Sequence, residues 1–290
     1  MTASALPPRP LAGLRILSLA LNLPGPAALM RARALGAECT KLEPPAGDPM
    51  RHYSPQAYAD LHAGVTVLAA NLKTGEGQAL LHEHLARSDL LLTSFRPSAL
   101  ARLGLGWEAL HARHPGVSHV SIVGARGEAA EVPGHDLTYQ AEHGLVTGLA
   151  LPATLYADMG GSLMAMEAIL QAALARGGEG RAFEVGLAEA AEYLALPRRW
   201  GLTTAGATIG GGHAGYQVYA CADGRVAVAA LEPHFAKALC EAAGLTADDP
   251  QAMALPATRE ALAAFFAGRT RAELEALAHR HDLPLHTLPA

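Results

Sequence analysis

The first half of the chain repeats one pattern, in which a short apolar run is followed by a helix-length segment and then by another apolar run. The apolar runs of strand length lie at residues 14–19, 39–42, 89–95 and 117–124. The segments with a helical pattern lie near residues 26–35, 75–87 and 99–113. Strands separated by helices pair in parallel, with right-handed crossovers. The pattern therefore predicts an α/β fold with an open, doubly wound parallel sheet of the Rossmann-like type.

The rest of the chain changes character twice. Its middle has a helical, a strand and a second helical pattern, at residues 135–176, 180–187 and 188–196. A glycine-rich segment at residues 206–215 marks a boundary, and residues 216–230 then alternate like a hairpin around Asp223-Gly224, a pair favoured in tight turns. Three helical patterns follow, at residues 233–243, 259–267 and 271–281. We expect a large α/β domain over residues 1–202 and a smaller α+β domain over residues 203–290.

The composition excludes several classes of protein. Half of the residues are hydrophobic and 17% are charged, which argues against disorder. The net charge is −5, so a nucleic-acid partner is not expected. The three cysteines form no CxxC pair. Residues 1–8 lack the features of a secretory signal, and no apolar stretch reaches the length of a membrane span. We expect a soluble, cytoplasmic protein with no membrane partner.

Asp158 is the first candidate for chemistry. It stands near the start of a predicted helix and is followed closely by Gly160 and Gly161. An aspartate in this place is often an ordinary helix cap. Paired glycines, however, let a ligand approach the backbone, and free N–H groups at a helix start offer a site for an oxyanion. Local spacing leaves both interpretations open.

Three further segments carry candidate site residues. His135-Asp136 follows Pro-Gly, and Glu232 stands just before a helical pattern. Both places are also typical of helix caps. Arg96 lies where a strand ends, at the edge of a doubly wound sheet where ligands usually bind.

Several familiar motifs are absent. The first strand is not followed by GxGxxG, and the chain contains neither GxxxxGK[ST] nor GxSxG. The pairs His111/His114 and His279/His281 lack the spaced partners of a metal site. We therefore expect no dinucleotide, no metal and no prosthetic group.

Taken in order, a series of short segments resembles the family III CoA-transferases and their relatives, the α-methylacyl-CoA racemases (CaiB/BaiF-like proteins). The matching segments are residues 10–17, 35–37, 41–45, 47–51, 71–74, 94–97, 103–105, 133–136, 157–158 and 231–235. The resemblance spans almost the whole chain, and its specificity comes from the order and spacing of the segments. It implies a large α/β domain, a small domain and a homodimer whose chains interlock.

The resemblance also implies an acyl-CoA substrate and two alternative activities. In the transferases, the aspartate matching Asp158 attacks the thioester, forming an acyl anhydride and then an enzyme–CoA thioester. In the racemases, the same aspartate and the histidine matching His135 exchange the α-proton of a 2-methylacyl-CoA. The residues matching Asp136 and Glu232 support Asp158 and His135, respectively. Because His135 is present, proton transfer ranks first and CoA transfer second.

For coenzyme A itself, the resemblance places Arg96 near the phosphates. Lys73, within the matching segment 71–74, and the pair Gly160 and Gly161 are further candidates for binding coenzyme A. Residues 63–66 stand where the family commonly has a basic stretch, and the C-terminus is short relative to the family. These departures motivate a third alternative, a member that binds coenzyme A or a partner without catalysis.

Overall fold

The computed structural model describes residues 9–245 and 251–290, and the chain divides into two compact units, Met1–Ala195 and Leu196–Ala290. The expected boundary, after residue 202, lies a short way beyond the observed one. Residues 1–8, on which the expectation about a secretory signal rests, lie outside the described residues. No helix of the described ranges is long and apolar enough to cross a membrane. The cytoplasmic location stays a prediction.

The first unit is built on a six-stranded sheet with the order β3-β2-β1-β4-β5-β6, and every pair in it is parallel. The strands are β1 (Arg15–Ser18), β2 (Glu38–Glu43), β3 (Thr66–Ala69), β4 (Leu90–Thr93), β5 (Ser118–Val123) and β6 (Ala182–Gly186). The predicted open, doubly wound parallel sheet is confirmed. The sequence pattern missed β3, a strand of four residues at the sheet edge, where fewer apolar side chains are needed.

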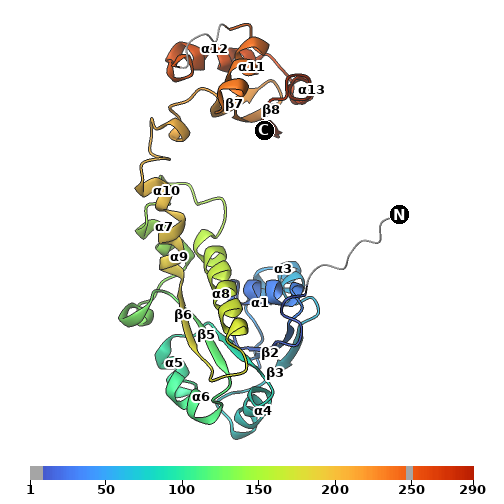
Figure 1. Ribbon diagram of the computed structural model, residues 1–290, viewed down its shortest axis with the longest axis vertical. Coiled ribbons are helices and arrows are strands. Elements are labelled where there is room, and N and C mark those ends of the chain that lie inside the picture. Colours follow the sequence, from blue (N-terminus) through green and yellow to red (C-terminus); the bar gives the residue numbers. More distant parts are fainter. Residues whose placement is uncertain (1–8, 246–250) are drawn as a thin grey trace, which may run out of the picture. The chain divides into compact units, whose positions relative to one another are not determined.

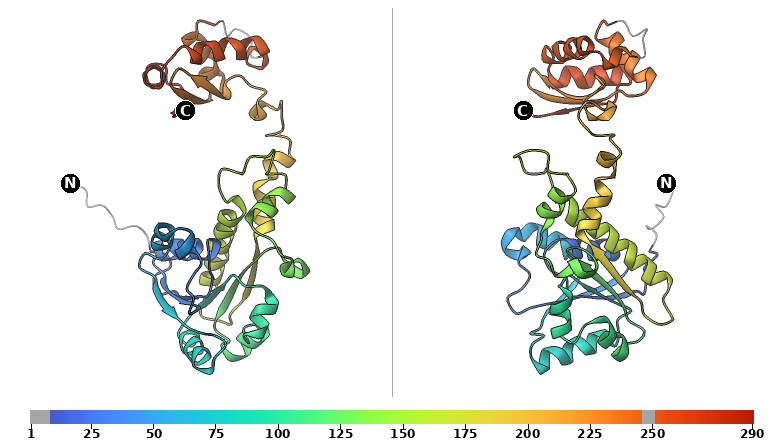
Figure 2. Two further views of the ribbon diagram at one scale, coloured as in Figure 1. Left: turned by 180° about the vertical axis from the view of Figure 1, so that it is seen from behind. Right: turned by 90° about the vertical axis from the view of Figure 1, so that its left-hand side faces the viewer.

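Helices cover both faces of this sheet (Figures 1 and 2). On one face, α1 (Pro24–Ala34) and α8 (Tyr156–Leu174) pack over Ile16, and on the other α4 (Gly75–Leu85), α5 (Pro97–Arg102) and α6 (Trp107–Arg113) pack over Leu17. Both side chains are almost fully buried. This explains the continuous apolar runs, because a parallel strand buried on two faces has no polar side.

The other helices of the first unit are short. They are α2 (Met50–Tyr53), α3 (Pro55–Leu61), η1 (Gly127–Glu131), α7 (Asp136–Glu142) and α9 (Leu187–Leu194). The helical pattern near residues 99–113 proves to be two helices, because the chain turns between them at Gly104, where φ is +72°. The helical pattern at 135–176 is likewise α7 and α8, joined by non-helical residues.

The second unit has a three-stranded antiparallel sheet, with the order β7-β8-β9, and its own hydrophobic core. Its elements are α10 (Leu196–Arg199), η2 (Thr208–Gly210), β7 (Tyr216–Cys221), β8 (Gly224–Ala229), α11 (Pro233–Ala242), η3 (Ala252–Ala254), α12 (Pro256–Ala267), α13 (Arg271–His281) and β9 (Leu285–Leu288). The capping box that begins α13 is present, with the Thr270 N–H 2.8 Å from the Glu273 carboxylate. The α+β composition of this unit is confirmed.

The hairpin turn differs from the expected one. Cys221 pairs with Gly224, so the turn residues are Ala222 and Asp223 rather than Asp223 and Gly224. Gly224 is instead a strand residue that passes close to the backbone of Leu288 in β9, where a side chain would collide. The glycine is therefore required by the neighbouring strand and not by the turn.

Candidate active site

A cavity of about 280 Å³ opens in the first unit, at the carboxyl ends of its central strands. The chain leaves β1 towards β2 on one side and leaves β4 towards β5 on the other. The loops after these strands therefore diverge, and ligands of doubly wound folds bind in the crevice between them. The cavity wall includes Leu21 and Asn22 after β1, Ser94 and Arg96 after β4, Gly124 after β5, and also His135, Tyr139, Asp158 and Leu187.

Asp158 reaches this cavity from the first turn of α8. It is the third residue of the helix, whose N-cap is Leu155, and no side-chain cap is present. Its backbone N–H donates to the Asp136 carboxylate at 3.0 Å. Within residues 9–245 and 251–290, no group donates a hydrogen bond to the Asp158 carboxylate. The alternative that Asp158 is an ordinary helix cap is therefore wrong.

The surroundings of Asp158 also change its acidity. Burial and the nearby Asp136 carboxylate raise the pKa of Asp158 to about 6, while His135 acts in the opposite direction. A carboxyl group with this pKa has both of its protonation states populated near neutral pH. It is therefore suited to receive and return a proton.

His135 is the N-cap residue of α7. The cap is formed through backbone groups and Thr138: the His135 N–H donates to Thr138 Oγ1 at 3.0 Å, and that hydroxyl donates to the His135 carbonyl at 2.7 Å. No described side chain hydrogen-bonds to the imidazole, which is exposed and lines the cavity. The ring is therefore available to a ligand while the backbone keeps the helix start in place.

Asp136 joins the starts of α7 and α8. It is buried, with one carboxylate oxygen on the Asp158 N–H and the other accepting from the Gln140 side chain. Gln140 is fully buried and also donates to the Thr154 carbonyl at 3.4 Å. Its Oε1 has no partner in the described parts of the chain. Asp136 thus contacts the main chain of Asp158 and acts on its side chain through charge.

Tyr139 is a cavity residue that the sequence analysis did not select. It is 7% exposed, and its ring lies against Gly124 and Gly134, both of which line the same cavity. Burial and the Asp158 carboxylate raise the pKa of Tyr139. A signal was present in the sequence, since residues three and four apart on a helix share a face, and Tyr139 stands in this relation to Asp136 and His135.

Of the residues expected to bind coenzyme A, only Arg96 lines the cavity. It is exposed and forms the N-cap of α5, at the carboxyl end of β4. Lys73 is exposed in the turn after β3, outside the cavity wall. Gly160 and Gly161 face α9 instead: a side chain at Gly160 would lie 3.0 Å from Leu194, and one at Gly161 would collide with Leu187. These glycines allow close packing of two helices, and their contact with coenzyme A stays a prediction.

Glu232 lies in the second unit, as the N-cap residue of α11. Its side chain makes no capping hydrogen bond, so the capping interpretation is not supported. Its interaction with His135 stays a prediction.

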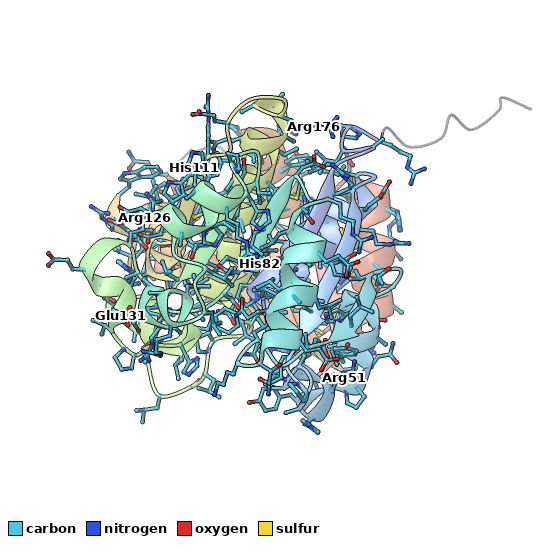
Figure 3. The ribbon with its side chains drawn as sticks, turned by 90° about the horizontal axis from the view of Figure 1, so that it is seen from below. Arg51, His82, His111, Arg126, Glu131 and Arg176 are labelled. Atoms are coloured by element: carbon cyan, nitrogen blue, oxygen red, sulfur yellow. The ribbon has the colours of Figure 1, made fainter. Side chains whose placement is uncertain are left out.

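Residues 126–135 contribute to one wall of the cavity, and hydrogen bonds to three carboxylates hold this segment in place. The Arg126 and Gly127 N–H groups donate to Glu189 at 3.0 Å and to Glu184 at 2.8 Å. At its other end, Glu131 accepts from the N–H and hydroxyl of Ser98, at 2.6 and 2.9 Å. Arg126 immediately precedes η1 and Glu131 is its last residue, and both are labelled in Figure 3. The segment that leads to His135 is thus fixed to β6, α9 and the start of α5.

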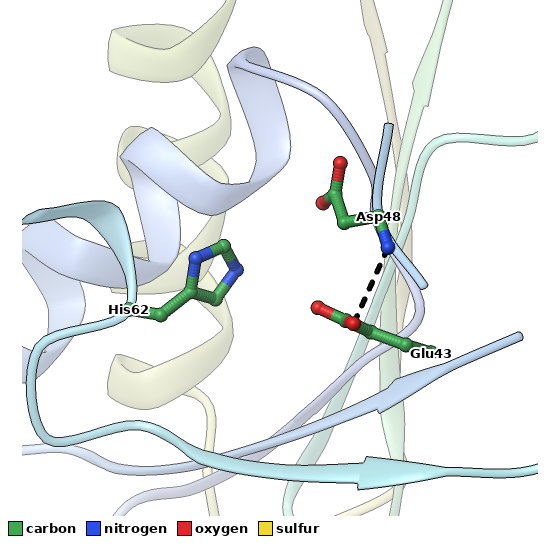
Figure 4. A group of neighbouring side chains, drawn as sticks. All are labelled: Glu43, Asp48 and His62. Atoms are coloured by element: carbon green, nitrogen blue, oxygen red, sulfur yellow. Dashed lines mark hydrogen bonds between the residues drawn. The ribbon is translucent and has the colours of Figure 1, made fainter. Parts of the chain in front are cut away.

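A buried cluster at the end of β2 contains Glu43, Asp48 and His62 (Figure 4). These three side chains are close enough together to hold a metal ion. The Lys41 ammonium already lies among them, 2.5 Å from Asp48, 2.8 Å from His62 Nε2 and 3.3 Å from Glu43. Lys41 therefore supplies the positive charge that the two carboxylates require.

The same cluster shapes the cavity. Asp48 accepts the backbone N–H of Asn22 at 3.1 and 3.2 Å on its two oxygens. Asn22 has a φ of +63°, a left-handed conformation that is uncommon for a residue other than glycine. The buried carboxylate thus holds the strained turn after β1, which forms part of the cavity wall.

The parallel sheet and the cavity at its switch point define an α/β protein with a candidate ligand site and no GxGxxG motif after its first strand. The chain belongs to CoA-transferase family III, whose family model matches residues 11–288.

Among curated relatives, the chain is similar to succinyl-CoA–D-citramalate CoA-transferase of Chloroflexus aurantiacus, with 36% identity over 206 residues, 64% of this chain and 51% of that protein. It is also similar to α-methylacyl-CoA racemase of Homo sapiens, with 29% identity over 287 residues, 91% of this chain and 73% of that protein. The chain thus spans about half the length of the transferase. A CoA-transferase and a racemase are thus both among its relatives, at 36% and 29% identity.

Solved structures resemble the chain over most of its length. A CaiB/BaiF family protein from Brucella suis has a TM-score of 0.81 and 25% identity, over 98% of this chain and 85% of that one. A hypothetical protein from Mycobacterium tuberculosis has a TM-score of 0.83 at 24% identity, with the same coverage. The family resemblance seen in the sequence is confirmed.

Proposed function

We propose that this chain processes acyl-CoA thioesters and that it racemises or epimerises a 2-methylacyl-CoA by proton transfer at the α-carbon. The observation that carries the proposal is the shared cavity of Asp158 and His135. One is a carboxyl group whose pKa is raised to about 6, and the other is an imidazole that no described side chain engages. A carboxyl group and an imidazole that share one cavity can exchange roles as acid and base.

In the proposed reaction, the Asp158 carboxylate removes the α-proton, and the electron pair of the C–H bond moves into an enolate of the thioester. The His135 imidazolium then delivers its proton to the opposite face of the α-carbon. For the opposite enantiomer, neutral His135 removes the proton and protonated Asp158 returns one. Asp136 and Glu232 are proposed to support Asp158 and His135, respectively.

Coenzyme A is the proposed carrier of the acyl group. The cavity is too small for the whole of this ligand and suits the acyl group and thioester. Arg96 stands at the cavity wall with an exposed guanidinium, a group well suited to phosphate. Lys73, Gly160 and Gly161 remain proposed contacts outside the cavity wall.

CoA transfer between carboxylic acids is the second candidate function. Two observations favour it: the Asp158 carboxylate accepts no hydrogen bond from the described residues, and several relatives are CoA-transferases. Asp158 would attack the thioester carbon, the C–S bond would break, and CoA thiolate would leave an aspartyl anhydride. The thiolate would then attack the aspartyl carbonyl, releasing the acid and forming the enzyme–CoA thioester. Binding of coenzyme A or a partner without catalysis is the third alternative.

A homodimer is part of the proposal. One side of α8 leaves a line of apolar side chains exposed, with the helical spacing of a contact surface: Tyr156, Met159, Leu163, Leu170 and Leu174. Exposed apolar side chains gathered on one face of a helix are typical of an interaction site. Size-exclusion chromatography with light scattering tests this, and a monomer across the concentration range would contradict it.

Incubation of the protein with a panel of acyl-CoA esters in deuterated water tests the reaction. Racemisation requires deuterium at the α-carbon, whereas transfer requires an acceptor acid and an aspartyl thioester that can be trapped. Asp158→Asn is expected to abolish both reactions. Loss of activity with Asp158→Asn but not with His135→Ala would exclude the racemase mechanism, and absence of any acyl-CoA binding would exclude both activities.

A further inference from the structure

We infer that Tyr139 is a further catalytic residue, whose phenol donates a hydrogen bond to the carbonyl oxygen of the thioester bound in the cavity. The inference rests on the proposed function only in taking an acyl-CoA thioester as the ligand. It holds for proton transfer and for CoA transfer alike, since both reactions place negative charge on that oxygen.

The hydroxyl of Tyr139 packs against two glycines of the cavity wall. A methyl group on Gly134 would lie 2.5 Å from the hydroxyl oxygen and 2.6 Å from the ring carbons beside it. A methyl group on Gly124 would collide with the same oxygen. Both glycines line the cavity, one at the end of β5 and the other just before α7. The ring is therefore clamped between backbone segments, and its orientation is fixed.

No described residue forms a hydrogen bond with this hydroxyl, although Tyr139 is only 7% exposed. The hydroxyl oxygen is not one of the fully buried polar atoms without a partner, so it keeps some exposed surface through which a ligand can pair with it. A purely packing role would be served equally well by phenylalanine. The cavity that Tyr139 lines is the place for such an acceptor.

The charges around Tyr139 keep it a donor. Burial has the largest effect on its pKa, followed by the Asp158 carboxylate, and Glu142 and Glu189 act in the same direction. Arg96 acts in the opposite direction, but the pKa of Tyr139 remains raised. The phenol therefore keeps its proton at neutral pH. In the proposed step it stabilises the enolate or tetrahedral oxyanion by hydrogen bonding, and no proton leaves it.

Tyr139→Phe tests the inference, because it keeps the ring between the two glycines and removes only the hydroxyl. Removal of one oxyanion donor typically lowers kcat by about 10²- to 10³-fold. We expect a loss of this size in kcat, with little change in KM and no loss of folding stability. Tyr193→Phe is the matched control, since Tyr193 is 68% exposed on α9 and lies outside the cavity wall. Equal kcat in wild type and Tyr139→Phe would overturn the inference.

A binding measurement separates this inference from the proposed function. Acetoacetyl-CoA forms an enolate that absorbs in the near ultraviolet, so its ionisation on the protein can be followed without turnover. We expect the wild type to bind a larger enolate fraction than Tyr139→Phe at the same pH. If that difference appears but no acyl-CoA is converted, the inference stands and the proposed function fails. Equal enolate fractions overturn the inference even if conversion occurs, and no binding to either protein overturns both.

Discussion

At the scale of single residues, hydrogen bonding distinguishes Asp158 from Asp89, another carboxylate of the α/β unit. Asp89 is held by Arg15 through three hydrogen bonds, which lower its pKa. Asp158 has no such donor among the described residues, and it is partly buried next to the charge of Asp136. The pKa values of the two aspartates are thus shifted in opposite directions by their surroundings.

The raised pKa of Asp158 predicts a dependence of stability on pH. In the unfolded chain its pKa is near 3.9, so folding favours the protonated form. This contribution is fully present below about pH 4 and is lost as pH rises through about 6. Relative to wild type, Asp158→Asn is therefore expected to gain about 1–3 kcal/mol of unfolding free energy at pH 8 compared with pH 4. Denaturant titrations at both pH values measure this, and an equal difference at both would contradict it.

Gln140 is expected to matter through Asp136. Gln140→Leu leaves a buried carboxylate oxygen without its side-chain donor, at a cost of about 1–3 kcal/mol in unfolding free energy. A fall in kcat should accompany this loss, because Asp136 also holds the Asp158 N–H.

The matched control is Gln171→Leu, because Gln171 bonds Glu167 at the same helical spacing on the exposed surface of α8. Its unfolding free energy should change little. Similar losses of stability in the two variants would mean that burial of Asp136 is unimportant.

At the scale of elements, the packing of α8 on α9 determines where Asp158 lies. Gly161→Ala would normally favour a helix, but the added methyl group would collide with Leu187, which lines the cavity. We expect a loss of about 1–3 kcal/mol in unfolding free energy and a lower kcat/KM. Gly178→Ala is the control, since nothing lies within 4 Å of the added carbon. A fully active and stable Gly161→Ala would show that the two helices adjust freely.

The buried cluster connects β2 to the turn after β1. Lys41→Met leaves Glu43 and Asp48 buried without their common counter-charge, and we expect a loss of about 3–5 kcal/mol in unfolding free energy. Arg87→Met breaks an exposed pair with Glu83 and should cost at most about 1 kcal/mol. Urea titrations of both variants compare the two losses. Equal losses of unfolding free energy in the two variants would show that burial does not strengthen the interaction of Lys41 with Glu43 and Asp48.

At the scale of the whole molecule, the chain contains two units with separate cores. Among the described residues, the buried side chains of the second core all lie at positions 214–283, within the second unit. A fragment of residues 196–290 is therefore expected to fold cooperatively alone. Circular dichroism during urea denaturation measures whether the fragment unfolds cooperatively. A gradual change in signal, with no plateau for a folded state at low urea, would show that the fragment requires the first unit.

The sequence by itself determined the architecture of the first unit. Buried parallel strands are apolar on both faces, and helices must connect them, so β1, β4 and β5 could be recognised from short apolar runs. The edge strand β3 was not recognised, because the side chains of an edge strand are less buried and need not form an apolar run. The capping box of α13 was equally visible, since its residues are three positions apart.

Only the tertiary structure decided the character of the candidate site. Local spacing could not decide whether Asp158 is a helix cap or a reactive carboxylate. The family resemblance implied a catalytic role for it but gave no physical reason for its reactivity. The cause is burial of Asp158, together with the Asp136 carboxylate, which lies 22 residues away in the chain and 3.0 Å from the Asp158 N–H. The helical spacing of Tyr139 from His135 and Asp136 was visible in the sequence, but its packing against Gly124 and Gly134, which follow β5 and precede α7, respectively, was not. The pKa and the hydrogen bonds of a side chain depend on distances and on burial. Both are properties of the folded chain and cannot be taken from the order of residues alone.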